Sequence, residues 1–185
     1  MKIKIPTGYT PTQYDANGIV TAEAVYPASW NGTFQAAKVW SNNPAWVFYD
    51  LLTNKRYGLG EFIDPNSIDK WTLYSIAKYC DGLVSKGTGE VGFAGLEPRF
   101  ACNLFLTTTE EAYTVMNNLA SVFRGITYWM SGKIFPVQDR PKSTVQLFTN
   151  ANVLNGVFNY SSSGKNQRRT GVTVRWNDPE DFYRP

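Results

Sequence analysis

The chain has 185 residues, 43% of them hydrophobic and 18% charged, which is typical of a folded globular protein and excludes a disordered chain. The net charge of +3 is too small to indicate nucleic-acid binding, and polar residues interrupt the longest apolar-rich stretches, 46–52 and 123–130, well before the length of a membrane helix. The chain has no histidine, which excludes the standard Ser–His and Cys–His nucleophiles and removes the commonest metal ligand.

Residues 1–41 are expected to form an extended, turn-rich segment. Residues 2–5 alternate like a short strand. Turn-forming residues then interrupt the chain at Pro6, Gly8, Pro11, Gly18, Pro27 and Gly32. No helical period runs through this part, so it has little core of its own. We expect it to pack on something else, which in an assembly protein can be a neighbouring subunit.

The first helix is expected to begin at Asn43–Pro44. Asparagine is a good N-cap, and proline is favoured at the first helical position because its missing N–H would be unpaired there in any case. Apolar residues then fall on one face, and the glycine-containing turn at 57–60 ends the helix.

A second helix is expected over 68–80, where apolar residues recur with helical spacing. Either Ser67 or Asp69 can cap its start, and Gly82 is a natural C-cap. The segment 82–98 is rich in glycine and is expected to be a mobile loop.

A third helix is expected after a strand over 100–106, which alternates apolar and polar residues. Thr108 and Glu111 have the spacing of a capping box, which indicates a helix start, and Gly125 stops the helix. The apolar stripe of this helix consists of Ala112, Val115, Met116, Leu119, Ala120 and Phe123.

The remaining elements are expected to be strands. Residues 126–130 and 133–138 form a hairpin around a Ser131–Gly132 turn, and Pro136 marks an edge strand because it cannot donate to the ladder. Beyond the break at 139–141, strands are expected at 144–148, 157–160 and 171–176.

This order of elements predicts an α+β fold, with an antiparallel sheet and about three helices. We divide the chain into an extended segment (1–41), an α+β domain (42–141) and a β-rich segment (142–185) that continues into a second domain outside this sequence.

No residues in the sequence form a recognisable catalytic, cofactor or metal site. Glu110 and Glu111 are adjacent, but they fall in the first turn of a helix, where acids suit the helix dipole. Cys80 and Cys102 lie on the apolar phases of their elements and resemble small buried hydrophobes, and the sequence does not decide whether they pair. We therefore expect no enzyme activity, no cofactor and no metal.

Aromatic residues make up 15% of the chain. The tryptophans are spread over the sequence, at Trp30, Trp40, Trp46, Trp71, Trp129 and Trp176. Core packing explains most tryptophans in proteins, but so much aromatic area in one small domain also favours a subunit interface. A sugar-binding surface is the alternative that the same residues leave open.

Several blocks of the sequence resemble one family in order. Residues 40–60 resemble its "W..NPAW…D.LT..RYG.G" segment, 69–81 its "D.W.LY…YCD", 97–99 its "EPR" and 138–141 its "QDRP". A shorter block at 176–179 resembles its "Y.DP" turn, with Trp176 in place of the usual tyrosine. The resemblance covers about 30–185, and the family is that of lambda-like phage tail-tip attachment proteins, also called host-specificity proteins J.

The resemblance implies a structural role. Members of the family form a trimeric hub at the end of the tail, so we expect other copies of the chain, other tail-tip proteins and the tape-measure protein as partners. The β-rich segment would then belong to a second hub domain. We expect the protein to be made in the host bacterial cytoplasm and to reside at the tail tip of the virion, either phage or prophage.

The family assigns receptor binding to a far C-terminal part that is absent here, and it offers no catalytic residues for this region. We expect no nucleic-acid partner. The candidate residues for an assembly interface are Trp30, Trp40, Trp46, Tyr57, Trp71, Arg140 and Trp176.

Two other classes of function stay open from the sequence. A carbohydrate- or receptor-binding module would need a contiguous exposed platform of Trp and Tyr side chains. A wall-degrading enzyme would need a cleft with two carboxylates about 5 to 10 Å apart.

Overall fold

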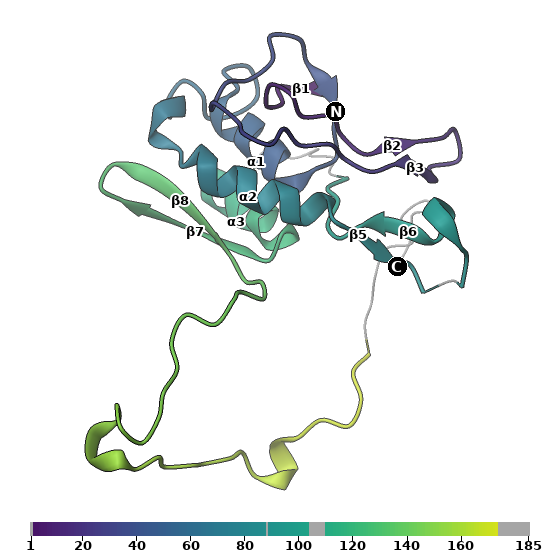
Figure 1. The fold of residues 1–185 in the computed structure, drawn as a ribbon. Helices are drawn as coiled ribbons and strands as arrows, with labels where there is room; N and C mark the ends of the chain where they lie inside the picture. Colours follow the sequence, from purple (N-terminus) through teal and green to yellow (C-terminus); the bar gives the residue numbers. More distant parts are fainter. Residues whose placement is uncertain (1, 88, 104–109, 174–185) are drawn as a thin grey trace. The chain divides into compact units, whose positions relative to one another are not determined.

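The computed structural model describes residues 2–87, 89–103 and 110–173 (Figure 1). The chain divides after Pro141 into two compact units, unit 1 (1–141) and unit 2 (142–185). Within the described residues, unit 1 contains three α-helices and four two-stranded antiparallel sheets. The expected α+β fold class is therefore confirmed.

The first two helices begin where their caps predict. Helix α1 (Pro44–Thr53) is capped by Asn43, whose side chain accepts a hydrogen bond from the backbone N–H of Ala45 at 3.0 Å. Helix α2 (Lys70–Asp81) is capped by Asp69 rather than Ser67, and it is followed by Gly82 as C-cap. The short 3-10 helix η1 (Pro65–Ser67) precedes it.

Helix α3 (Ala112–Val122) begins after Glu111, which makes no capping hydrogen bond with its side chain. Thr108, the other half of the predicted capping box, lies outside the described residues. The helix ends before Gly125: Phe123 is the C-cap, and Arg124 takes a positive φ of 55° at the turn into the next strand. No described helix is long and apolar enough to cross a membrane.

The N-terminal segment is held by two small sheets. Strand β1 (Lys2–Ile3) pairs with β4 (Val39–Trp40), and β2 (Gln13–Tyr14) pairs with β3 (Val20–Ala22). The segment folds onto the helices of its own chain and supplies Ile3, Ile5, Tyr9 and Trp30 to their core. Residues 1–41 and the described part of 42–141 thus share one core and one compact unit.

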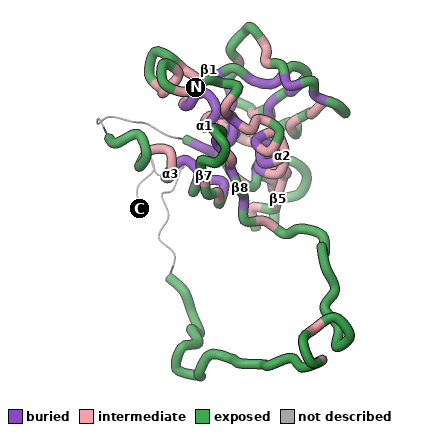
Figure 2. The backbone as a smooth tube through the Cα atoms, turned by 90° about the vertical axis from the view of Figure 1, so that its left-hand side faces the viewer, coloured by how far each residue is buried: buried purple, intermediate pink, exposed green. Residues whose placement is uncertain are grey.

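The core of unit 1 lies around the helices, and α1 packs against both α2 and α3. Figure 2 shows the buried residues gathered along these elements. Trp46, Phe48 and Phe123 have no exposed surface at all. Burial of such large apolar side chains is the main favourable term in folding.

The hairpin predicted after α3 is confirmed. Strand β7 (Gly125–Met130) pairs with β8 (Lys133–Gln138) around the turn at Ser131–Gly132, where both residues have positive φ. A backbone hydrogen bond from Asp69 to the carbonyl of Ile134 joins β8 to the start of α2.

Two sequence expectations between α2 and α3 are wrong. The segment 82–98 is a hairpin rather than a loop: β5 (Leu83–Ser85) pairs with β6 (Leu96–Pro98), and the 3-10 helix η2 (Gly92–Gly95) connects them. Residues 100–103 form no strand, although their apolar alternation predicted one. Residues 104–106 of that predicted strand lie outside the described part of the chain.

Unit 2, over its described residues 142–173, contains two 3-10 helices, η3 (Leu154–Gly156) and η4 (Lys165–Gln167). The strands expected at 144–148 and 157–160 are not found there, and neither is the start of the one expected at 171–176. A strand exists only where a second strand completes its ladder, and alternation along the sequence does not show whether that partner is present.

Candidate assembly surface

The residues of the family-like blocks mostly hold unit 1 together. Asn43 caps α1 and also donates from its side-chain amide to the carbonyl of Ala77 in α2, at 2.9 Å. Asp50 accepts a short hydrogen bond from the hydroxyl of Tyr57, which brings the turn after α1 back onto the helix. These side chains bind elements of the chain to one another.

Asp81, at the end of α2, ties the N-terminal segment to the helices. Its carboxylate accepts hydrogen bonds from the hydroxyls of Tyr9 at 2.7 Å and Tyr26 at 2.5 Å. Burial raises the pKa of the Asp81 carboxyl, and the hydrogen bonds from Tyr26, Tyr9 and Asn43 oppose the rise. Burial, followed by the charge of Asp81, raises the pKa of both phenols.

This arrangement predicts a loss of stability at alkaline pH. Because the folded state raises the pKa of Tyr9 and Tyr26, it keeps their protons where the unfolded chain loses them, so stability falls as the pH rises above about 10. Each phenol contributes a slope of about 1.4 kcal/mol per pH unit in that range. The double substitution Tyr9→Phe, Tyr26→Phe is expected to flatten this slope in urea unfolding between pH 8 and 11. The exposed Tyr113→Phe is the control; an unchanged slope in the double variant would contradict the assignment.

The tryptophans predicted for an interface separate into buried and exposed residues. Trp46 is fully buried and Trp30 is 8% exposed, so both belong to the core of unit 1, where Trp30 stacks on Tyr74. Trp40 is 44% exposed and Trp71 is 53% exposed. These two side chains present aromatic surface to the solvent.

The other three predicted residues differ in their surroundings. Tyr57 is 47% exposed, although its hydroxyl is bound to Asp50. Arg140 is half-buried and stands over the ring of Tyr79. Trp176 lies outside the described residues.

An exposed apolar surface that was not predicted from the sequence lies on one face of the β7–β8 hairpin. Cross-strand partners on this face are Ile126 with Val137 and Tyr128 with Phe135, whose rings stack with centroids 5.6 Å apart. The exposed fractions are 74% for Ile126 and 44% for Tyr128. We call Ile126, Tyr128, Met130, Phe135 and Val137 the hairpin face.

The signal for this face was present in the sequence. In β7, both faces of the strand carry apolar side chains: Tyr128 and Met130 lie on one face, and Trp129, which stands between them in the sequence, lies on the other. A strand with one solvated face alternates apolar and polar residues. Apolar side chains on both faces of a strand therefore indicate that each face packs against another part of the protein or against a partner.

A shallow pocket of about 360 Å³ lies beside Trp40. The ring of Tyr14 meets that of Trp40 edge-on at 5.6 Å, and its hydroxyl accepts a hydrogen bond from Asn42. The pocket is lined by Pro11, Thr12, Gln13, Tyr14, Val39 and Trp40. It offers one aromatic pair to a ligand, whereas a sugar-binding module would need a wider platform.

Comparison with known proteins identifies the relatives of this chain. No family model matches it. The tip attachment protein J of Escherichia phage SECphi27 is 38% identical over 181 residues, and that of Escherichia phage SECphi4 is 36% identical over 183 residues, each covering 98% of the chain. The chain is homologous to a segment of tip attachment protein J. The resemblance noted from the sequence blocks is thereby confirmed.

The chain spans 14% of the SECphi27 tip attachment protein J and 15% of the SECphi4 protein. The homology therefore concerns one segment of a much longer tail-tip protein. The names of both relatives describe attachment and neither describes an enzyme. Within the described residues of this chain, no cluster of three or more Cys, Asp or Glu side chains is placed to hold a metal ion.

Proposed function

We propose that the chain is a structural segment of a phage tail-tip protein, and that it acts in assembly rather than in catalysis. The observation that carries the proposal is the match of 98% of the chain to tip attachment proteins J, together with the exposed hairpin face of unit 1. A contiguous exposed apolar surface on a soluble domain marks an interaction site. The hairpin face is the contact surface for a neighbouring polypeptide in the tail tip.

The partners we propose are other copies of the same protein, arranged as a trimer, and the other tail-tip and tape-measure proteins. Host attachment belongs to parts of the longer protein outside this chain. The protein is made in the host cytoplasm and functions at the tip of the virion tail.

Unit 2 supports an assembly role independently of the hairpin. Figure 2 draws nearly all of 142–173 as exposed, and Val145 and Tyr160 are 95% and 90% exposed. The other large apolar residues with exposed side chains in this range are Leu147, Phe148, Leu154, Val157, Phe158 and Val172. Such a segment gains little by burial within itself, and a partner surface would supply the apolar contact.

The experiment that tests this proposal uses the full-length tail-tip protein with Ile126→Ser and Val137→Ser together. Because both side chains are exposed, the double variant is expected to change the thermal midpoint of the 185-residue chain by only a few degrees, equivalent to about 1 kcal/mol. In the full-length protein, light scattering is expected to show a shift from trimer towards monomer.

Phe62→Ser provides a matched control, since Phe62 is an exposed apolar residue of unit 1 that does not belong to the hairpin face, at 86% exposure. It is expected to leave the mass of the assembly unchanged. A full-length protein that is monomeric before any substitution would refute the trimer, and a trimer insensitive to the double variant would remove the hairpin face from its interface.

A further inference from the structure

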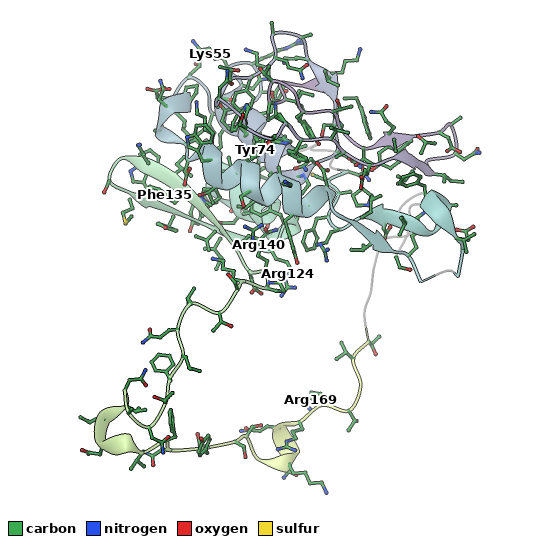
Figure 3. The ribbon with its side chains drawn as sticks, in the orientation of Figure 1. Lys55, Tyr74, Arg124, Phe135, Arg140 and Arg169 are labelled. Atoms are coloured by element: carbon green, nitrogen blue, oxygen red, sulfur yellow. The ribbon has the colours of Figure 1, made fainter. Side chains whose placement is uncertain are left out.

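Two arginines of unit 1 share one aromatic ring. The guanidinium carbon of Arg99 lies 4.5 Å from the centroid of the Tyr79 ring, and that of Arg140 lies 5.4 Å from the same centroid. Arg99 follows β6, Arg140 follows β8 and Tyr79 belongs to α2, so three separate elements bring these side chains together. Arg140 is labelled in Figure 3, below α2.

The two arginines are positioned differently. Arg140 is fixed by hydrogen bonds to the carbonyl oxygen of Ser75 at 3.1 Å and to its hydroxyl oxygen at 2.7 Å. Arg99 is exposed and makes no side-chain hydrogen bond within the described residues. One guanidinium is thus anchored, and the other keeps its donors available to a ligand.

Neither arginine has an ion-pair partner among the described residues, although carboxylates lie close by in the sequence. Asp139, next to Arg140, forms an ion pair with Arg124 at 2.6 Å. Asp81, two residues after Tyr79, accepts its hydrogen bonds from the tyrosines of the N-terminal segment.

The third carboxylate, that of Glu97 in β6, forms no ion pair within the described residues. Burial raises the pKa of Tyr14, the hydrogen bond from Asn42 opposes the rise, and the negative charges of Asp81 and Glu97 add to it. The positive charges of Arg140 and Arg99 both act on the thiol of Cys80, whose pKa burial raises to about 12. The negative charge of Asp81 acts on the same thiol more strongly than either arginine, but this carboxylate is bound by Tyr9 and Tyr26 and forms no ion pair with the guanidiniums within the described residues.

We propose that Arg99 and Arg140, held over the ring of Tyr79, form a binding site for a carboxylate side chain of a partner protein. A guanidinium binds a carboxylate through two parallel N–H···O hydrogen bonds, and the fixed position of Arg140 lowers the entropy lost on binding. Phe100, half-buried with its ring 6.4 Å from that of Tyr79, adds apolar surface beside the charges. The ligand is an acidic residue with an apolar neighbour.

Charge favours a protein ligand over a nucleic acid. Counted from the sequence, 1–141 contains 12 Lys and Arg and 12 Asp and Glu, so unit 1 has no net charge. Nucleic-acid binding needs a basic stripe that follows many phosphates. A pair of arginines on a neutral unit matches one or two carboxylates instead. This inference depends on the geometry of unit 1 and does not require the hairpin face to be an interface.

The test uses the whole 185-residue chain and follows the arginine Nε–H signals by NMR. The probes are an acetylated tetraglutamate peptide, its tetraglutamine counterpart and inorganic phosphate. Tetraglutamate is expected to shift the signals of Arg99 and Arg140 saturably, and tetraglutamine is expected to leave them unchanged. Arg99→Gln is expected to weaken tetraglutamate binding about tenfold, since it removes a charge-assisted pair.

Arg99 is the residue to substitute first, because its side chain makes no hydrogen bond within the described residues and its backbone bond to Gly82 survives the substitution, whereas Arg140→Gln also removes the contacts with Ser75. Arg56→Gln, an exposed arginine elsewhere in unit 1, is the matched control. Equal shifts at Arg56, or no shift at Arg99 and Arg140, would overturn the proposal. Tighter binding of phosphate than of tetraglutamate would overturn the protein ligand in favour of a phosphate group.

Discussion

Replacing Trp46 with alanine is expected to lower the free energy of unfolding of unit 1 by roughly 3 to 5 kcal/mol, the usual range for a fully buried aromatic residue. The side chain has no exposed surface. Five aromatic rings surround it at centroid distances from 5.8 to 6.5 Å, and they belong to Tyr9, Trp30, Phe34, Tyr49 and Tyr74. Removing the indole leaves a cavity between the N-terminal segment and α1 and α2.

The measurement is urea unfolding followed by circular dichroism, with Trp46→Phe as the companion variant. The indole nitrogen of Trp46 is buried without a hydrogen-bond partner within the described residues. Phenylalanine removes this unsatisfied donor and keeps most of the apolar volume, so its cost is expected to be about half that of alanine. If Trp46→Ala had the same free energy of unfolding as the parent chain, the N-terminal segment would not pack on α1.

The starts of α1 and α2 and the β7–β8 hairpin could be predicted because their signals are local. The asparagine before Pro44 and the aspartate before Lys70 act on N–H groups two or three residues away. The turn at Ser131–Gly132 likewise joins neighbouring strands. In each case a few adjacent residues contain all the information that decides the structure.

The place of the N-terminal segment could not be predicted, since the contacts that decide it are distant in sequence. Tyr9 is 72 residues from Asp81, and Tyr26 is 55 residues from it. The residues around Tyr9 and Tyr26 in the sequence do not indicate which group accepts their hydrogen bonds. The sequence predicts only that the segment packs on something else, and the structure shows that Tyr9 and Tyr26 bind a carboxylate of the same chain.

The candidate site likewise combines residues that could be predicted from the sequence with an arrangement that depends on distant contacts. Tryptophan content alone predicted both Trp40, which is exposed, and Trp46, which is not, because residue type does not report burial. The convergence of Arg99 and Arg140 on Tyr79 depends on the packing of β8 against α2 and on the backbone hydrogen bonds that join Arg99 and Phe100 to the end of α2. The family-like blocks that contain these residues are separate in the sequence and gave no indication that they meet.

Replacing Gly58 with alanine is expected to destabilise unit 1 by about 3 kcal/mol, because the added methyl group would collide with backbone atoms. A Cβ at this position would lie 2.0 Å from the carbonyl oxygen of Leu51 in α1. The same oxygen accepts the backbone hydrogen bond of Leu59 at 2.9 Å, so the turn has to approach the end of the helix closely. Moving the turn away would break this bond and separate Tyr57 from Asp50.

Gly82→Ala is the matched control, since Gly82 has a φ of −55°, which any residue adopts, and its nearest neighbour would be the Tyr79 carbonyl oxygen at 3.3 Å. This contact is tight but needs a shift of only a few tenths of an ångström, so alanine there is expected to cost no more than about 1 kcal/mol. Urea unfolding of both variants compares a glycine required by close backbone approach with one that only follows a helix. If the two substitutions cost the same, the turn after α1 does not lie against Leu51, and the contact between Tyr57 and Asp50 loses its structural basis.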